Sequence, residues 1–314
     1  MSESKPKVVV VGSFMMDLVV KAERRPRKGE TLIGDEFGMF IGGKGTNQAI
    51  AAARLGAKVH MVGRLGTDLF GDMFVSALDK DGINTQFIAR DPEVGTGVGT
   101  PVIDAQGDNS IIIIPRANMR LSVEDVNKAE GAISAADVLL LQLEVPIPSS
   151  QRAAEIARAG GATVILNPAP ARELPDDFLK YIDIITPNET ETEILTGVEI
   201  TDQAGAQRAA KILLDKGMSA VVLTLGERGA LLLTREMTKA IPAYKIEVVD
   251  TTAAGDAFCG ALATAIARGE SLEQAVGYAN AAGAIAVTIM GAEPSMPTRQ
   301  QLEEFLKKKG IGER

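Results

Sequence analysis

The stretch "DTTAAGDAF", residues 250–258, places a single carboxylate at the opening of a helix built from small apolar residues. We expect a strand over 244–250, a turn of small residues, and a helix that begins near Gly255. The backbone amides of 253–256 would point outward at this start, where the helix dipole favours an anion. Asp256 is therefore a candidate acid–base group beside an anion site. A simple capping charge in the first helical turn is the competing interpretation.

A second candidate is the glycine-rich stretch "FIGGKGTNQAI", residues 40–50. Residues 38–45 nearly match the phosphate-loop pattern G-x-x-x-x-G-K-[ST], but Gly45 stands where the magnesium-binding hydroxyl is required, so we reject that motif. The glycines still permit close approach of the backbone to a ligand. Lys44 and Asn47, at the expected start of a helix, would donate hydrogen bonds to a polyol. A tight strand-to-helix turn without a ligand explains the same residues.

Composition removes several other kinds of chemistry. His60 is the only histidine, which argues against a Ser-His-Asp triad and a His-rich zinc site. Acid–base work then falls to carboxylates, lysines or the backbone. Cys259 is the only cysteine, so no disulfide forms within the chain, and the polar opening residues do not resemble a signal peptide; both favour the cytoplasm. The net charge of −8 argues against nucleic acid, and no apolar run is long enough to cross a membrane.

The elements that must hold these residues alternate between strands and helices, which predicts a mostly parallel sheet covered on both faces. The expected strands are buried on both faces and occupy 7–12, 58–63, 137–144, 163–169, 182–187 and 220–226. The expected helices occupy 45–56, 69–81, 122–132, 149–159, 189–196, 202–216, 255–268, 271–288 and 298–309.

Two stretches, 14–41 and 84–115, interrupt this alternation because they are strand-rich and lack helical periodicity. The second contains an expected hairpin with its turn at 105–108. Both read as insertions into a single domain over 1–314, forming a small sheet that covers a site at the carboxyl ends of the main strands. A surface appendage is the alternative.

Together, "GGKGTNQ" and "DTTAAGD" resemble the two signatures of the ribokinase family of carbohydrate and nucleoside kinases. The likeness covers nearly the whole chain in order. Further matching stretches are "GSFMMDLV", "LQLE", "NPAPARELP", "TPNETE", "TLGERG" and "GAEPSMP".

The resemblance implies a three-layer α/β/α sandwich with a β-sheet lid, and a homodimer formed through the lids. It implies transfer of a phosphoryl group from Mg-ATP to the primary O5 hydroxyl of D-ribose, with Asp256 as general base. The turn amides that would stabilise the transferring group are Ala253, Ala254 and Gly255. A 2-deoxyribose kinase is the first alternative; another sugar or nucleoside kinase, or a sensor without catalysis, follows.

The remaining site residues also come from the resemblance. Sugar hydroxyls would be held by Asp17, Gly43, Lys44, Asn47, Glu144 and Asp256. The nucleotide would lie along Asn188, Thr224, Gly226, Gly255 and Asn280. Magnesium would be organised through water by Asn188 and Glu191, although a helix cap followed by an exposed acid explains that pair equally well. An activating potassium ion would be bound, largely through carbonyls, by Asp250, Thr252, Ala286, Ile289, Gly291 and Ser295.

Two residues depart from the usual family pattern. Met15 stands where many ribokinases carry an amide that helps to read the sugar. A methionine does not satisfy a hydroxyl as an amide does, so Met15 favours acceptance of 2-deoxyribose. Arg116 stands where a small residue is usual, and it is either solvated or able to reach substrate or phosphate.

Overall fold

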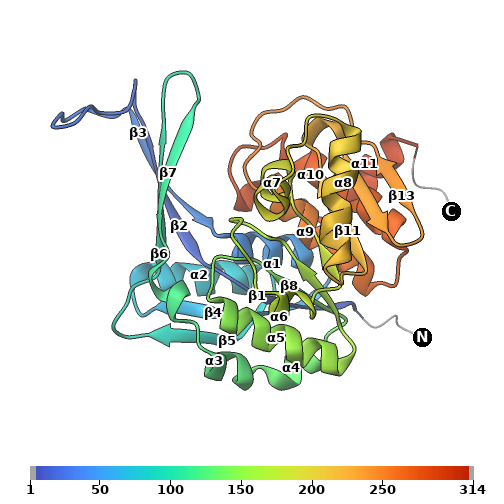
Figure 1. The fold of residues 1–314 in the computed structure, drawn as a ribbon. Helices are drawn as coiled ribbons and strands as arrows, with labels where there is room; N and C mark the ends of the chain where they lie inside the picture. Colours follow the sequence, from blue (N-terminus) through green and yellow to red (C-terminus); the bar gives the residue numbers. More distant parts are fainter. Residues whose placement is uncertain (1–4, 311–314) are drawn as a thin grey trace.

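The computed structural model describes residues 5–310 and has a large nine-stranded sheet at its centre (Figure 1). The strand order is β13-β12-β11-β10-β9-β8-β1-β4-β5, parallel from β5 to β11 and antiparallel for the last two strands. These strands are β1 (Lys7–Val11), β4 (Lys58–Gly66), β5 (Asn84–Asp91), β8 (Val138–Leu141), β9 (Thr163–Leu166), β10 (Ile184–Ile185), β11 (Ala220–Thr224), β12 (Ala230–Thr234) and β13 (Thr238–Ile241).

Helices cover both faces of this sheet, as the alternation predicted. One apolar core takes in Val8 and Val10 of β1, and the other takes in Val9 and Val11, because neighbouring strand residues point to opposite faces. The first core is closed by α1 (Lys44–Arg54), α2 (Leu69–Lys80), α9 (Ala254–Ala267), α10 (Leu272–Ala286) and α11 (Arg299–Lys308). The second is closed by α3 (Val123–Lys128), α4 (Glu130–Ser134), α5 (Ile147–Gly160), α6 (Asp176–Leu179) and α8 (Gln203–Asp215), and α7 (Glu189–Thr196) packs on α8. No helix of residues 5–310 is long and apolar enough to cross a membrane.

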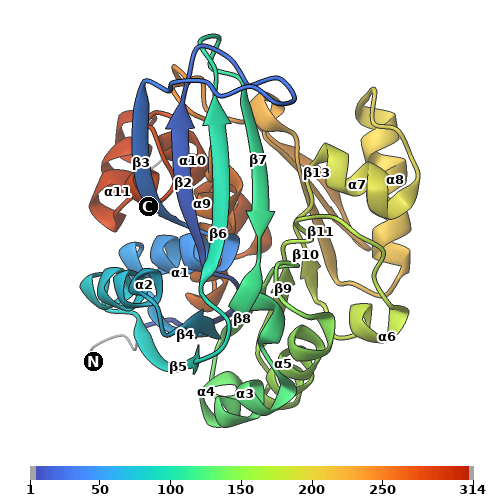
Figure 2. The same cartoon turned by 90° about the vertical axis from the view of Figure 1, so that its left-hand side faces the viewer.

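A separate four-stranded sheet, which we call the small sheet, rises from one end of the main body (Figure 1) and is seen face-on in Figure 2. Its order is β3-β2-β6-β7, with bounds β2 (Met15–Lys21), β3 (Glu36–Gly42), β6 (Gly97–Ile103) and β7 (Asn109–Ile114). The predicted hairpin is present: Asp104 N–H donates to Asp108 O at 3.0 Å, and Gly107 has φ 85°. The expected small sheet is thus confirmed.

Two expectations about strand boundaries are wrong. Residues 84–91 form β5, which pairs with β4 in the large sheet, so the insertion contributes only β6 and β7 to the small sheet. Phe87 and Ile88 of β5 pack against opposite cores, which draws this segment to the main body. No strand forms over 244–250. Val248 and Val249 are more than half exposed there, so this segment is not packed against the core as a strand of the large sheet would be.

Candidate active site

The structure brings the two glycine-containing motifs together around Asp256. Helix α9 follows Ala253, which has a left-handed φ of 60°, and the Asp256 side chain lies in its first turn with 5% exposure. Its Oδ2 accepts a hydrogen bond from Asn47 Nδ2 at 2.9 Å. Its Oδ1 accepts one from Gln48 Nε2, also at 2.9 Å. Asp256 is therefore held from both sides by amides of α1 and is more than a capping charge.

The small residues of α9 explain how the two helices come so close. Helices α1 and α9 pack against each other, with Gly260 at the contact. A Cβ at Gly260 would lie 2.6 Å from Ala51 Cβ and 2.8 Å from Gln48 O. Larger residues on this face would push α1 away, and Asp256 would lose its two amide donors.

Glycines also seat α1 at the carboxyl end of β1. Gly43, which precedes the helix, has φ 89°, and a Cβ there would lie 2.7 Å from Met15 N. A Cβ at Gly45 would lie 2.7 Å from Gly12 Cα and would overlap Ser13 N. The lack of side chains at these positions lets the start of α1 contact the chain after β1, with Gly45 N–H donating to Ser13 Oγ at 3.2 Å.

Two further carboxylates face the same region. Glu144, after β8, accepts a hydrogen bond from Lys44 N–H at 3.0 Å and another from the Ser13 hydroxyl. Asp17 of β2 lies between Gly42 and Gly99 of the flanking strands, where any Cβ would overlap its carboxylate oxygens. Burial raises the pKa of Asp17 to about 6, and the charge of Glu144 adds to this effect. The small sheet thus carries one acid of the site and the main body the other.

Lys44 is the cation among these acids. Burial lowers the pKa of its ammonium group, but the charges of Asp256, Glu144 and Glu191 outweigh burial and raise that pKa above its usual value. Burial also raises the pKa of Glu191, against the opposing effects of the Asn188 N–H and Lys44. Lys44 therefore stays charged, stabilised by the charges of three carboxylates.

Asn188 and Glu191 form the helix cap that was the competing interpretation. Asn188 Oδ1 accepts from Glu191 N–H at 2.7 Å, and Glu191 Oε2 accepts from Asn188 N–H at 3.0 Å. Thr224 N–H donates to Pro187 O at 2.9 Å, which fixes this cap against the end of β11, just before Gly226 with φ 56°. Capping uses one Glu191 oxygen, and the Lys44 charge also acts on this carboxylate.

The other predicted nucleotide residue, Asn280, is anchored elsewhere. Its Nδ2 donates to Ile241 O at 3.1 Å and to Pro242 O at 3.2 Å, so α10 holds the end of β13 through this side chain.

The predicted potassium residues lie on two segments that Asp250 joins. Its Oδ1 accepts from Thr252 N–H and its Oδ2 from Gly291 N–H, both at 2.8 Å, while Val287 O accepts from Asp250 N–H at 3.1 Å. Ala286 and Ile289 lie on the second segment; Ser295, in a short 3₁₀ turn, donates to Ala292 O at 2.8 Å. Within residues 5–310, no three His, Cys, Asp or Glu side chains gather as a metal site.

The two departures from the family pattern lie at the base of the small sheet. Met15 begins β2 and is 3% exposed. Arg116 has a left-handed φ of 46°, and its Nη1 donates to Thr96 O at 3.1 Å. Burial raises the pKa of Asp68, but its hydrogen bonds with Thr96 and Gly71, together with the Arg116 charge, outweigh this and lower it. Arg116 is therefore engaged by the strand base rather than simply solvated.

Sequence reasoning missed the polar floor beneath Asp256. Gln48 also donates to Asn167 Oδ1 at 3.1 Å, and Gln142 donates to Gln48 Oε1 at 2.6 Å. Thr186 Oγ1 contacts the buried Cys259 Sγ at 3.4 Å, and burial raises the pKa of that thiol to about 12. The available signal was polar amides directly after strands that are buried on both faces.

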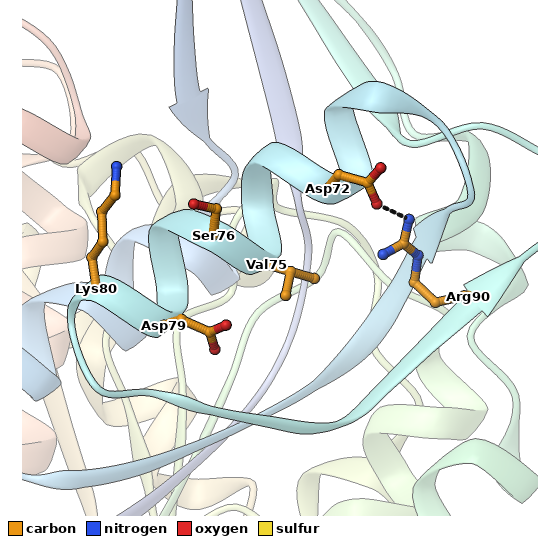
Figure 3. A pocket seen from close by; sticks show the side chains of 6 residues that line it. All are labelled: Asp72, Val75, Ser76, Asp79, Lys80 and Arg90. Carbon is orange, nitrogen blue, oxygen red and sulfur yellow. Dashed lines mark hydrogen bonds and ion pairs between the residues drawn. The ribbon is translucent and has the colours of Figure 1, made fainter.

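A surface pocket of about 580 Å³ lies away from these residues, on α2 and β5 (Figure 3). Asp72 and Arg90 form an ion pair at 2.7 Å at one end of it, so these two charges satisfy each other. Its lining contains no residue of the predicted site; it consists of Asp72, Val75, Ser76, Asp79, Lys80 and Arg90.

Comparison with known proteins agrees with the geometry. The family model described as pfkB family carbohydrate kinase matches residues 5–299. A ribokinase of Haemophilus influenzae is 42% identical over 299 residues, 95% of this chain and 98% of that protein. A deoxyribokinase of Salmonella typhimurium is 39% identical over 300 residues, 95% of this chain and 98% of that protein. The structure of Arabidopsis thaliana ribokinase complexed with ribose and ATP superimposes with a TM-score of 0.91 at 34% identity, covering 97% of this chain and 99% of that one. The predicted resemblance and fold class are confirmed, and the chain belongs to the pfkB family of carbohydrate kinases.

Proposed function

We propose that the protein transfers the γ-phosphoryl group of ATP to the O5 hydroxyl of D-ribose, giving ribose 5-phosphate. The observation that carries this proposal is the Asp256 carboxylate, held between the Asn47 and Gln48 amides at the start of α9, directly after the left-handed turn at Ala253. The ribokinase relatives and the ribokinase structure with bound ribose and ATP support the choice of sugar and nucleotide.

In the proposed reaction, Asp256 accepts the proton of the attacking hydroxyl. The amides of Ala253, Ala254 and Gly255 are proposed to face the developing negative charge on the transferring phosphoryl group, because the first amides of a helix have no partner within it. The Ala254 N–H makes only a long hydrogen bond, to Thr251 O at 3.4 Å, which the phosphoryl group would replace. Lys44 adds a fixed positive charge beside the same centre. Asp17, Gly43, Asn47 and Glu144 orient the sugar, and a carboxylate that accepts two adjacent hydroxyls fixes that orientation well. Positioning and charge stabilisation supply most of the catalysis in phosphoryl transfer.

Two ions belong to this proposal. The described residues fit a magnesium ion bound chiefly by phosphates and water, because Asn188 and Glu191 are partly engaged with each other and form no carboxylate cage. Magnesium neutralises charge on the phosphates when bound. For potassium, the Asp250 carboxylate joins the two backbone segments that would supply carbonyl ligands. Burial raises the pKa of Asp250, but its hydrogen bonds to Thr252 and Gly291 outweigh this and lower it, so the carboxylate is ionised.

The small sheet is the proposed lid, and we propose that two lids pair in a cytoplasmic homodimer. It exposes large apolar side chains, with Phe37 66% and Ile112 70% exposed. If the protein were a monomer, both edge strands of the small sheet and its apolar side chains would be exposed to water. Light scattering distinguishes the two assemblies.

The experiment that tests the function is ADP release from Mg-ATP with potassium, across D-ribose, 2-deoxy-D-ribose, D-fructose and adenosine. Strong turnover of ribose is expected, with a fall when potassium is replaced by an inert cation. Turnover of fructose or adenosine alone would overturn the sugar assignment. Absence of turnover with all four, while ribose binding remains measurable, would favour a sensor.

A kinase for 2-deoxyribose is the second candidate, favoured by the buried Met15 and by the deoxyribokinase relative. We expect Met15→Asn to raise the ratio of kcat/KM for ribose over deoxyribose by roughly tenfold, about the effect of one added hydrogen bond. Met237→Asn, in the turn between β12 and β13, is the control. An unchanged ratio would show that Met15 does not contribute to sugar selection.

The raised pKa of Asp17 predicts a pH dependence. Asp17 accepts hydroxyl hydrogens at both oxygens only when it is ionised, so kcat/KM for ribose should fall as pH drops below about 6. Because its folded pKa lies above the ordinary 3.8, its stabilising effect is full below that value and is lost as pH rises to about 6. Asp17→Asn should therefore unfold at a higher temperature than wild type above pH 6, while kcat/KM drops by about tenfold or more.

The matched control is Asp35→Asn, an exposed carboxyl in the loop before β3. It should change neither the pH profile nor the melting temperature. If the wild-type profile were flat from pH 5 to 8, the role of Asp17 in sugar binding would be wrong.

A further inference from the structure

Beneath Asp256 lies a row of buried amides, which we call the amide row: Gln142, Gln48 and Asn167. Gln48 and Gln142 have no exposed surface, and Asn167 has 8%. Gln48 Nε2 donates to Asp256 Oδ1 at 2.9 Å and to Asn167 Oδ1 at 3.1 Å, while its Oε1 accepts from Gln142 Nε2 at 2.6 Å. Both amide hydrogens and the oxygen of Gln48 are thus used.

This pattern permits only one orientation of the Gln48 amide. If that amide turned over, its oxygen would face the oxygens of Asp256 and Asn167, and its nitrogen would face the Gln142 nitrogen. Acceptors would then face acceptors and donors would face donors. Because these atoms are buried, water cannot replace the lost hydrogen bonds, and the reversed orientation is destabilised. The acceptor oxygens of Asp256 and Asn167 therefore set which end of Gln48 meets Asp256. Gln142 supplies the donor for the opposite end of that amide, and its own buried Oε1 has no hydrogen-bond partner in the part of the chain that the structure describes.

The ends of three strands hold the amide row in place. Asn167 follows β9; its N–H donates to Leu141 O at 2.9 Å and its Nδ2 to Thr186 O at 3.1 Å. Gln142 directly follows β8, and its Oε1 lies where a Cβ at Gly12 would be. The absence of a side chain at Gly12, after β1, provides the space that Gln142 fills. The row is therefore built into the rigid edge of the large sheet.

We propose that Gln48 and Gln142 are positioning residues for the reaction: Gln48 fixes the plane of the Asp256 carboxylate, and Gln142 fixes Gln48. With Asn47 on Oδ2 and Gln48 on Oδ1, the carboxylate does not rotate, and its remaining lone pairs keep one direction. A base must meet the attacking hydroxyl within hydrogen-bond reach, so a rotated carboxylate lowers kcat. This inference rests on the proposed function, which assigns the base to Asp256.

The test is a double-mutant cycle with the nearly isosteric substitutions Gln48→Met and Gln142→Met, assayed with the sugar that wild type phosphorylates best. We expect kcat to fall by about 100-fold for Gln48→Met and about 10-fold for Gln142→Met, the scale of a small misplacement of a reacting group. The double variant should match Gln48→Met alone, because Gln142 acts through Gln48. KM for the sugar should stay within about twofold. If Gln48→Met does not fold, Gln48→Leu replaces it, since it removes the donor without placing a second acid beside Asp256.

The control is Gln151→Met on α5, whose amide only contacts Glu155, and it should leave kcat unchanged. If the double variant lost kcat by the product of the two single losses, Gln142 would not act through Gln48. That result, or a lower melting temperature with unchanged kcat, would show a purely structural role and overturn the inference. A crystal structure of Gln142→Met gives a readout that does not need turnover. It should show a displaced Gln48 amide and a rotated Asp256 carboxylate; an unmoved Asp256 would overturn the inference even if the proposed function failed.

Discussion

Asp256→Asn is expected to lower kcat by about 1000-fold, within the range that a positioned general base contributes. The amide cannot take the proton of the attacking hydroxyl, and its NH2 group would face one of the two donors, Asn47 or Gln48, instead of accepting from it. Sugar binding should weaken only a few-fold, because Asp17 and Glu144 remain. Steady-state ADP release gives kcat, and titration calorimetry with ribose gives the binding constant.

The control for this variant is Asp177→Asn on α6, whose side chain is 82% exposed. It should keep wild-type kcat and melting temperature. An Asp256→Asn variant that retained more than a tenth of wild-type kcat would rule out Asp256 as the base. Loss of ribose binding together with a lower melting temperature would instead indicate that the variant damages the contact between α1 and α9.

Gly45→Ala is expected to destabilise the fold by roughly 3 kcal/mol or more, at the upper end of overpacking costs. Its Cβ would meet backbone atoms of Gly12 and Ser13, which cannot rotate away as a side chain does. Relief requires α1 to move off the end of β1, which displaces Lys44 and Asn47 as well. The melting temperature should fall by about 6 °C or more, and calorimetry or circular dichroism would measure it.

The same substitution at Gly277, Gly277→Ala, is expected to stabilise the fold and not to destabilise it. Gly277 lies in the interior of α10, and a Cβ there meets no heavy atom within 4 Å. Alanine should stabilise the helix by about 0.5–1 kcal/mol, because the unfolded chain loses freedom. If both variants melted at the wild-type temperature, close backbone packing at Gly45 would not be what holds α1.

Much of the fold was predictable because its central strands are buried on both faces. Segments such as "KVVVVG" and "DVLLLQLE" leave few alternatives to a covered parallel sheet, and they coincide with β1 and β8. Edge elements were harder to predict. The segment of β5 is only partly buried over most of its length, so its sequence does not show which sheet it joins. By contrast, "YKIEVVD" looks like a strand but pairs with no neighbouring strand among residues 5–310. Whether such a segment forms a strand, and in which sheet, depends on the strands available to pair with it and not on its local sequence pattern.

The site residues that lie within short sequence signatures could be predicted, and the others could not. Asp256 and Asn47 came from short signatures, and the structure places them 2.9 Å apart. Gln48 and Gln142 were missed because an amide in a helix or after a strand usually faces water or caps a turn. Their role depends on burial beneath Asp256, which arises only when α1, α9 and the ends of β1 and β8 meet.

The contact between Asn47 and Asp256 joins residues 209 positions apart in the chain. The carboxylate that we assign as base belongs to α9, which the ribosome makes after every strand of both sheets. During synthesis, the growing chain therefore has the two acids that we propose to hold the sugar, on β2 and after β8, well before it has the proposed base. A chain released before residue 256 would still contain Asp17 and Glu144 but would transfer no phosphate, so turnover reports that translation has passed that point.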